Sequence, residues 1–295
     1  MMFKDELKKY VAESGLVNMK PAGDGIFVLK YKKKVFYDNL WNEYIAECRG
    51  TIVDSEFNVV QRPFTKIYNY GIEKEAPVLS DDTEITALRK VNGFMVAMTW
   101  HNGDILVSTT GSTSGEFVDM AKEYITDNFR DVLRCAPDFT FMFECVHPTD
   151  PHIIPEEPGL YFIGFRHKDW NGKLYYEKFT LEPLGKHLGC LPVDIFTTTV
   201  GELKALVKTV KHEGFVFYTK DGVGSKIKSP YYLTSKWVAR NPRTDKLVDL
   251  NKDIKHNLDE EYYPLVDAIR ANIEEYTAMD EQARLSWVRN YMETV

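Results

Sequence analysis

Residues 88–99 read Leu-Arg-Lys-Val-Asn-Gly-Phe-Met-Val-Ala-Met-Thr, and the rest of the chain is interpreted from this stretch. Lys90 comes just before a glycine turn at Gly93, and the apolar run that follows predicts a buried strand. A lysine in this position is held on a rigid element, which suits a nucleophile. Taken alone, Lys90 is more simply a solvated lysine at the entrance of a strand. The assignment therefore depends on residues elsewhere in the chain.

The bulk composition is that of an enzyme-sized cytoplasmic protein. A chain of 295 residues can bury a sizeable core and predicts one large domain with a smaller one. No apolar run approaches the roughly 20 residues needed to cross a membrane, and acids and lysines occupy the N-terminus where a secretory signal would be apolar. The four cysteines form no Cys-x-x-Cys pair, which argues against a zinc site or a disulfide framework. We expect a cytoplasmic monomer without membrane contact.

The formal net charge is −7, which argues against indiscriminate coating of nucleic acid, because that needs many cations facing phosphates. Basic residues nevertheless cluster in two segments, 30–34 and 204–228, while acids concentrate toward the C-terminus. The asymmetry leaves open a nucleic-acid substrate held in a local basic groove.

Apolar periodicity predicts an α+β fold. Asn102-Gly103 is a strong tight-turn signal between two strand-like runs, which predicts a hairpin directly after Lys90. One apolar stripe predicts a single helix from Ser114 through Val132. Strands are further expected at 25–31, 46–53, 59–62, 139–146, 215–218 and 223–228, and a helix at 201–211.

From about residue 234 the strand patterns end and two helical segments are expected, around 265–276 and 280–292. We therefore expect a domain of twisted antiparallel sheets flanked by helices over residues 1–233, and a small all-helical domain over residues 234–295.

Glu144 interrupts an otherwise apolar and aromatic strand. A carboxylate in such a strand costs several kcal/mol if it is buried and unpaired. It must therefore face solvent or meet a ligand or a cation, and we favour the ligand.

The candidate site residues fall in a fixed order along the chain. The order is Arg49, Lys66, Lys90, Gly93, Phe143-Glu144, Glu213-Gly214, Lys226 and Lys228. This order resembles the covalent nucleotidyltransferase superfamily of ligases and capping enzymes. The wording over residues 40–235, such as Glu-Cys-Arg-Gly at 47–50, Arg-Pro-Phe-x-Lys-x-x-Asn at 62–69 and Phe-Glu-Cys-Val-x-Pro-Thr-Asp at 143–150, resembles the tRNA-repair ATP-dependent RNA ligases of T-even phages.

The resemblance implies three nucleotidyl transfers. Lys90 would attack the α-phosphate of ATP to form a lysyl adenylate, AMP would pass to a 5′-phosphate end of RNA, and a 3′-hydroxyl end would then displace AMP. It further implies a role for each site residue: Glu144 on the ribose hydroxyls, Glu213 on a divalent metal ion (Mg2+ or Mn2+), Arg49 and Lys66 on the triphosphate, and Lys226 and Lys228 on the α-phosphate beside Gly93. The partner would be RNA with 5′-phosphate and 3′-hydroxyl ends, with tRNA as one candidate.

The chemistry explains why cations are needed around the nucleophile. A lysine of ordinary pKa, about 10.4, is uncharged in only about one molecule in a few thousand at neutral pH. Nearby positive charges disfavour a further charge and also neutralise the α-phosphate during attack. We therefore expect Lys226, Lys228 and a divalent ion to lower the pKa of Lys90 by an amount worth about 4 kcal/mol.

Alternative functions remain open at this point. A DNA ligase or a GTP-using capping enzyme would share the same residues, and a nucleic-acid-binding protein with a decayed active site is a different class altogether. Two departures from the family pattern keep the last alternative alive. Asn92 stands where the family usually has Asp, and Thr110 precedes Gly111-Ser112 where the phage enzyme carries a lysine.

Overall fold

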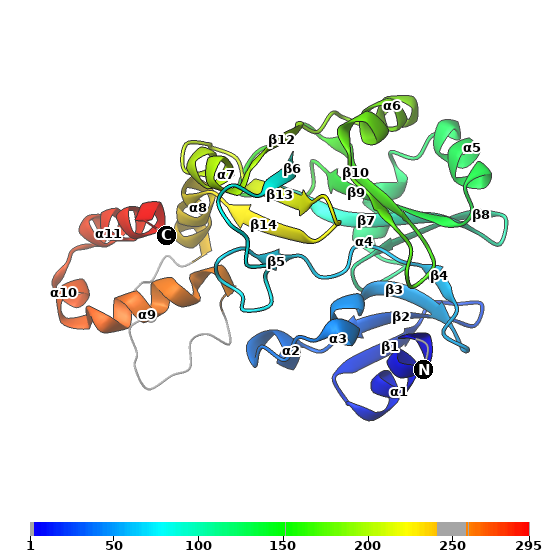
Figure 1. Ribbon diagram of the computed structural model, residues 1–295, viewed down its shortest axis with the longest axis horizontal. Helices are drawn as coiled ribbons and strands as arrows, with labels where there is room; N and C mark the ends of the chain where they lie inside the picture. Colours follow the sequence, from blue (N-terminus) through cyan, green and yellow to red (C-terminus); the bar gives the residue numbers. More distant parts are fainter. Residues whose placement is uncertain (1–2, 151, 241–257, 259, 295) are drawn as a thin grey trace. The chain divides into compact units, whose positions relative to one another are not determined.

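A computed structural model of the chain describes residues 3–150, 152–240, 258 and 260–294, and these form two compact units (Figure 1). Unit 1 comprises Met1–Ile67, Val91–His152 and Glu156–Phe196, and unit 2 comprises Tyr68–Lys90, Ile153–Pro155 and Thr197–Val295. Both are α+β, and their three sheets are mostly antiparallel. The predicted boundary at residue 234 stays a prediction, and residues 241–257 and 259 of the predicted C-terminal domain lie outside the described residues.

Unit 1 holds two sheets. A four-stranded antiparallel sheet has the order β1-β2-β3-β4, with bounds Val17–Pro21, Ile26–Tyr31, Arg49–Asp54 and Val59–Gln61. Its helices are α1 (Phe3–Glu13), α2 (Lys33–Tyr37) and α3 (Glu43–Glu47). A five-stranded antiparallel sheet has the order β11-β10-β9-β7-β8. Its strands are β7 (Phe94–His101), β8 (Asp104–Thr109), β9 (Phe139–Val146), β10 (Gly159–His167) and β11 (Leu174–Tyr175), and its helices are α4 (Glu116–Lys122), α5 (Asp127–Cys135) and α6 (Lys178–Leu188).

The sheet of unit 2 has the order β12-β6-β13-β14-β5. Its strands are β5 (Tyr68–Asn69), β6 (Glu84–Arg89), β12 (Ile195–Thr199), β13 (Gly214–Thr219) and β14 (Gly224–Lys228). Strand β13 pairs antiparallel with both β6 and β14, whereas β14 pairs parallel with β5. The helices are α7 (Val200–Val207), α8 (Pro230–Arg240), the 3-10 helix η3 (Glu260–Tyr262), α9 (Tyr263–Ala271), α10 (Ile273–Ala278) and α11 (Glu281–Thr294).

The strongest local signals of the sequence are confirmed. Strands β7 and β8 pair antiparallel, and Asn102 and Gly103 between them have φ values of 49° and 85°, as a tight primed turn requires. The predicted strand 139–146 is β9. In the C-terminal part the predicted helical segments are present, although the first is divided at Asn272 into α9 and α10. Leu265, Tyr276 and Val288 meet there in one buried cluster.

Two sequence predictions are wrong in detail. The single helix expected over 114–132 is two helices, α4 and α5, because Thr126 between them adopts an extended conformation with φ −107° and ψ 176°. The strand expected from residue 46 begins only at Arg49. Residues 43–47 form α3 instead, because the Asn42 side chain caps this helix by accepting the N–H of Ile45 at 2.9 Å.

Among the described residues, the model contains no helix with both the length and the apolar character that a membrane span would need.

A buried ion pair organises the loop before Lys66. Arg62 donates two hydrogen bonds to the Glu47 carboxylate, at 3.0 and 2.9 Å, and both side chains are about 5–7% exposed. Thr65 donates to the same carboxylate at 2.7 Å, and Arg166 donates to Thr65 at 3.1 Å. Burial raises the pKa of Glu47, but the hydrogen bond and charge of Arg62, with Arg166 and Thr65, outweigh it and hold this pKa below its usual range. Much of the Arg-Pro-Phe-x-Lys motif is thus structural.

Replacing Arg62 with alanine would leave Glu47 buried without its bidentate partner. We expect the R62A variant to lose about 3–5 kcal/mol of unfolding free energy, measured by urea denaturation. The matched control is Arg134→Ala, which removes an exposed pair with Asp131 and should cost less than about 1 kcal/mol. If both variants lost the same small amount of unfolding free energy, the buried Arg62–Glu47 pair would not be an important source of stability.

Candidate active site

The register of unit 2 brings three separate parts of the sequence to one end of its sheet. Lys90 follows the last residue of β6, and its N–H donates to the Gly214 carbonyl at 2.9 Å. Gly214 pairs in turn with Lys228 at the end of β14. Because β6 and β14 both run antiparallel to β13, the C-terminal ends of β6 and β14 lie beside the N-terminal end of β13, and Figure 1 shows these three strands as neighbours. Lys90, Glu213 and Lys228 therefore meet.

Glu213 lies between the two lysines. Its Oε2 is 3.1 Å from Nζ of Lys90 and its Oε1 is 3.7 Å from Nζ of Lys228. The Glu213 side chain is 4% exposed and that of Lys90 is 21% exposed. The carboxylate is thus enclosed, whereas the Lys90 side chain keeps about a fifth of its surface exposed.

Gly214 is required by the close approach of β14. A Cβ atom on this residue would lie 2.2 Å from the carbonyl oxygen of Ile227 and 2.7 Å from Cα of Lys228, and its φ of +136° is rare for residues with side chains. The Glu-Gly pair of the sequence therefore has a physical reason: glycine lets β14 come near enough for Lys228 to reach Glu213.

The sequence analysis missed two charged residues of this cluster. Glu261 in η3 accepts from Lys228 at 2.5 Å and from Lys236 in α8 at 3.3 Å. Both newly found residues are buried. Lys90, Glu213, Lys228, Glu261 and Lys236 form a chain of alternating charge, called the charge chain below. No local pattern marks Glu261, because it lies 33 residues beyond Lys228 in a different element.

Burial and pairing act in opposite directions on the inner members of the charge chain. Burial lowers the pKa of Lys228, but the carboxylates of Glu261 and Glu213 outweigh it and raise this pKa above its usual range. Burial likewise raises the pKa of Glu261, and the charges of Lys228, Lys236 and Lys226 bring it well below its usual range. Lys228 and Glu261 are therefore both charged near neutral pH.

Lys226 lies two residues before Lys228 on β14, so both side chains start from the same face of the strand. It pairs with Asn69 of β5 and adds a positive charge that acts on Glu261. When Lys226 is counted with the charge chain, unit 2 brings four lysines and two glutamates into one region.

The remaining predicted site residues, Arg49, Lys66, Gly93 and Glu144, belong to unit 1. Gly93 allows β9 to approach, because a Cβ there would lie 2.3 Å from the Cys145 carbonyl oxygen. Its N–H donates to the Glu144 carboxylate at 3.3 Å, and Glu144 is 8% exposed. Like Gly214, Gly93 thus permits the close approach of a neighbouring strand, here β9, which carries Glu144.

The two predicted triphosphate-binding cations of unit 1 are held differently. Lys66 is buried, and its ammonium lies 3.9 Å from the centre of the Trp41 ring. Arg49 begins β3, and within the described part of the chain its buried Nε has no hydrogen-bond partner. An unsatisfied guanidinium N–H is compatible with an anionic ligand.

Both departures from the family pattern have a charged neighbour in unit 1. The ammonium of Lys30 lies 3.3 Å from the Thr110 hydroxyl, so a cation stands beside the position that lacks a lysine. The Glu156 carboxylate accepts from the N–H of Asn92 at 3.4 Å, so an acid stands beside the position that lacks an aspartate. The basic segment 30–34 was the only signal in the sequence for Lys30.

Glu213 is the candidate ligand for a divalent ion. Among the residues that the structure describes, no group of three or more His, Cys, Asp or Glu side chains could hold a metal. Glu213 offers one carboxylate beside lysines that favour phosphate. This fits Mg2+, which proteins usually bind through one or two carboxylates together with substrate phosphates.

Burial, with the positive charges of Arg49 and Lys20, lowers the pKa of Lys30 to about 8. We therefore expect acetylation of Lys30 by an amine-reactive ester to rise with pH around a midpoint near 8, followed by peptide mass spectrometry. Arg49→Gln should move the midpoint upward, because it removes the larger of the two repelling charges. A midpoint near the ordinary lysine value of about 10.4 in the parent would contradict the burial of this cation.

No family model matches the sequence, and no curated protein matches it. Among solved structures, an archaeal ATP-dependent RNA ligase (form 2) superposes with a TM-score of 0.60 at 18% identity, covering 98% of this chain and 77% of that one. A candidate ATP-dependent DNA ligase from Aquifex aeolicus superposes with a TM-score of 0.60 at 15% identity, covering 97% and 77%. Form 1 of the archaeal enzyme gives a TM-score of 0.59 at 17% identity, covering 98% and 77%. The chain therefore has the fold of ATP-dependent polynucleotide ligases.

Proposed function

We propose that this chain is an ATP-dependent RNA ligase that works through a covalent adenylate on Lys90. The observation that carries the proposal is the Lys90–Glu213–Lys228 arrangement, in which an accessible lysine lies 3.1 Å from an enclosed carboxylate that a second lysine also faces. The ligase-like fold supports it at the level of the superfamily.

In the first step the Lys90 ammonium gives a proton to water, and the neutral Nζ then attacks the α-phosphorus of ATP. An N–P bond forms, the bond from phosphorus to the bridging oxygen breaks, pyrophosphate leaves, and Nζ loses a second proton to water. AMP then passes to the 5′-phosphate of an RNA end, and the 3′-hydroxyl of a second end displaces it to form a phosphodiester. Lys228 and Lys226 would stabilise the negative charge that develops on the α-phosphate.

The ion pair with Glu213 must open before Lys90 can react, because a neighbouring carboxylate favours the charged ammonium. Glu213 would hold the divalent ion, and a carboxylate engaged in this way no longer favours the charge on Lys90. When bound, the ion neutralises phosphate charge. The sequence analysis expected Lys226, Lys228 and a divalent ion to act on Lys90, and the Glu213 carboxylate, 3.1 Å from the Lys90 ammonium, adds a negative charge beside them.

The decayed-site alternative is less well supported. A protein that only binds nucleic acid does not require an enclosed carboxylate between two lysines, because removing charges from water costs free energy. The two departures that favoured decay, Asn92 and Thr110, each have a charged neighbour in Glu156 and Lys30.

A DNA ligase remains the second candidate, because the candidate DNA ligase from Aquifex aeolicus has a TM-score equal to that of an archaeal RNA ligase. The motif sequences at 47–50, 62–69 and 143–150, which resemble those of RNA ligases, favour RNA over DNA as the substrate. Arg49, Lys66 and Glu144 keep the nucleotide-binding roles that the resemblance implies.

The adenylation step is tested with ATP labelled at the α-phosphate and Mg2+, followed by denaturing electrophoresis. The parent chain should retain label and Lys90→Ala should retain none, because the variant lacks the amine that forms the N–P bond. Lys74→Ala removes an exposed lysine and should label like the parent. A parent without label, well folded by circular dichroism, would refute the covalent mechanism, and label from GTP alone would support a capping enzyme.

The substrate is tested separately with nicked duplexes that differ only in sugar. We expect the adenylated parent to seal 5′-phosphate and 3′-hydroxyl RNA ends at least about tenfold faster than the matching DNA ends, a difference of about 1.4 kcal/mol in the barrier. Faster sealing of DNA would overturn the assignment to RNA and leave the adenylation chemistry intact.

A further inference from the structure

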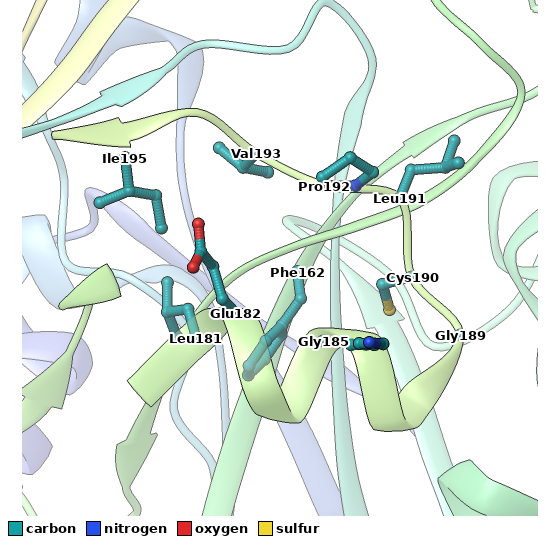
Figure 2. A pocket seen from close by; sticks show the side chains of 11 residues that line it. Phe162, Leu181, Glu182, Gly185, Gly189, Cys190, Leu191, Pro192, Val193 and Ile195 are labelled. Carbon is teal, nitrogen blue, oxygen red and sulfur yellow. The ribbon is translucent and has the colours of Figure 1, made fainter. Parts of the chain in front are cut away.

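Two cavities in the molecule have contrasting walls. In unit 1, α6 and the segment 189–195 enclose a cavity of about 420 Å³ whose wall is largely apolar, with Phe162, Leu181 and Val193 among its lining (Figure 2). Nothing in this lining selects a ligand. In unit 2, a cavity of about 480 Å³ has four lysines in its wall, and we call it the lysine-lined cavity.

The lysine-lined cavity lies within unit 2, next to β14 and β5. Lys204 and Lys208 come from α7 and its C-terminal cap, and Lys226 and Lys228 come from β14. Tyr70 and Tyr291 also line it. Its volume is within the range of small-ligand sites, about 300–1,000 Å³.

The charge in this cavity is strongly positive. Among the described residues of its lining, Glu261 is the one carboxylate, and it is already paired with Lys228 at 2.5 Å and with Lys236 at 3.3 Å. Lys204 and Lys208 are exposed, and they extend the positive surface outward from Lys228, whose side chain is 10% exposed. A chain with a net charge of −7 thus gathers cations here, in the segment 204–228 that the sequence analysis singled out.

We propose that the lysine-lined cavity binds the sugar-phosphate backbone of the nucleic-acid strand. The proposal rests on the proposed function and adds to it a place for the strand. Phosphates are the anions that a nucleic acid offers in series, and flexible lysines bind them as point charges. Lys228 lies in the cavity wall and also faces Glu213 at 3.7 Å, so a strand held here lies beside the charge chain that contains Lys90. The two tyrosine rings offer apolar surface to a sugar or base.

One contact competes with this role. The Asp81 carboxylate lies 3.0 Å from the ammonium of Lys204, and both side chains are about half exposed or more. An exposed pair of this kind contributes at most about 1 kcal/mol, so a phosphate can replace Asp81. Removing the Asp81 charge should therefore strengthen strand binding, a direction that loss of structure would not produce.

The test measures binding of a short 5′-phosphorylated single-stranded RNA to the full chain by fluorescence anisotropy, without ATP, over a series of KCl concentrations. The double variant Lys204→Ala/Lys208→Ala should bind about tenfold more weakly at low salt, and its log-log salt slope should be shallower by about 1.4, because each lost phosphate contact removes about 0.7 on single strands. Asp81→Asn should bind more tightly than the parent.

The matched control is Lys211→Ala/Lys220→Ala, which removes the same charge from two exposed lysines that do not line the cavity. It should bind RNA like the parent. Equal weakening in both double variants would overturn the site in favour of a general charge effect, and unchanged binding in the Lys204/Lys208 variant would overturn it directly. A raised KM for ATP in the adenylation assay, with RNA binding intact, would assign the cavity to the nucleotide triphosphate.

Failure of this inference is distinguishable from failure of the proposed function. Strand binding is read without ATP and adenylation is read without RNA. A parent that binds RNA through Lys204 and Lys208 but forms no adenylate would keep the site and refute the ligase. A parent that forms the adenylate but binds RNA independently of these lysines would keep the ligase and refute the strand-binding site.

Discussion

The charge chain from Lys90 through Glu213, Lys228 and Glu261 to Lys236 is the interaction on which unit 2 depends. The side chains of the inner members Glu213, Lys228 and Glu261 are only 4–10% exposed, and each has an oppositely charged partner on either side. A buried charge that loses its partner destabilises a protein by several kcal/mol, so the members constrain one another. The register of β6, β13 and β14 and the position of η3 must satisfy this chain together, and the ammonium of Lys90 is oriented as a result.

Unit 1 applies the same physics to a different purpose. The Arg62–Glu47 pair is closed by Thr65 and Arg166 and leaves no charge open to a ligand. It fixes the loop from which Lys66 reaches the Trp41 ring. In this motif, therefore, Arg62 and Thr65 hold the loop in place, and Lys66 is the residue whose position they fix.

At Asn92 and Thr110, where the family pattern has a charged residue, a charged side chain from elsewhere in the chain lies in contact with the position. Glu156 lies 64 residues from Asn92, and Lys30 lies 80 residues from Thr110, yet each contacts the position where the family pattern has a charge. A comparison of motifs by position alone counts both departures as losses. The electrostatic field depends on which charges are near, whichever strand carries them.

The sequence by itself determined the α+β class, the β7–β8 hairpin, strand β9 and the order of the charged motifs, because periodicity and turn residues act within a few positions of the chain. Only the tertiary structure decided that the helix after Ser114 is divided at Thr126, that Glu261 and Lys236 extend the charge chain, and that Lys204 and Lys208 share a cavity with Lys228. Periodicity reports which face of an element is buried. Which charges then meet depends on strand register and on helices placed by packing, and these join residues too distant in sequence for any local pattern to connect them.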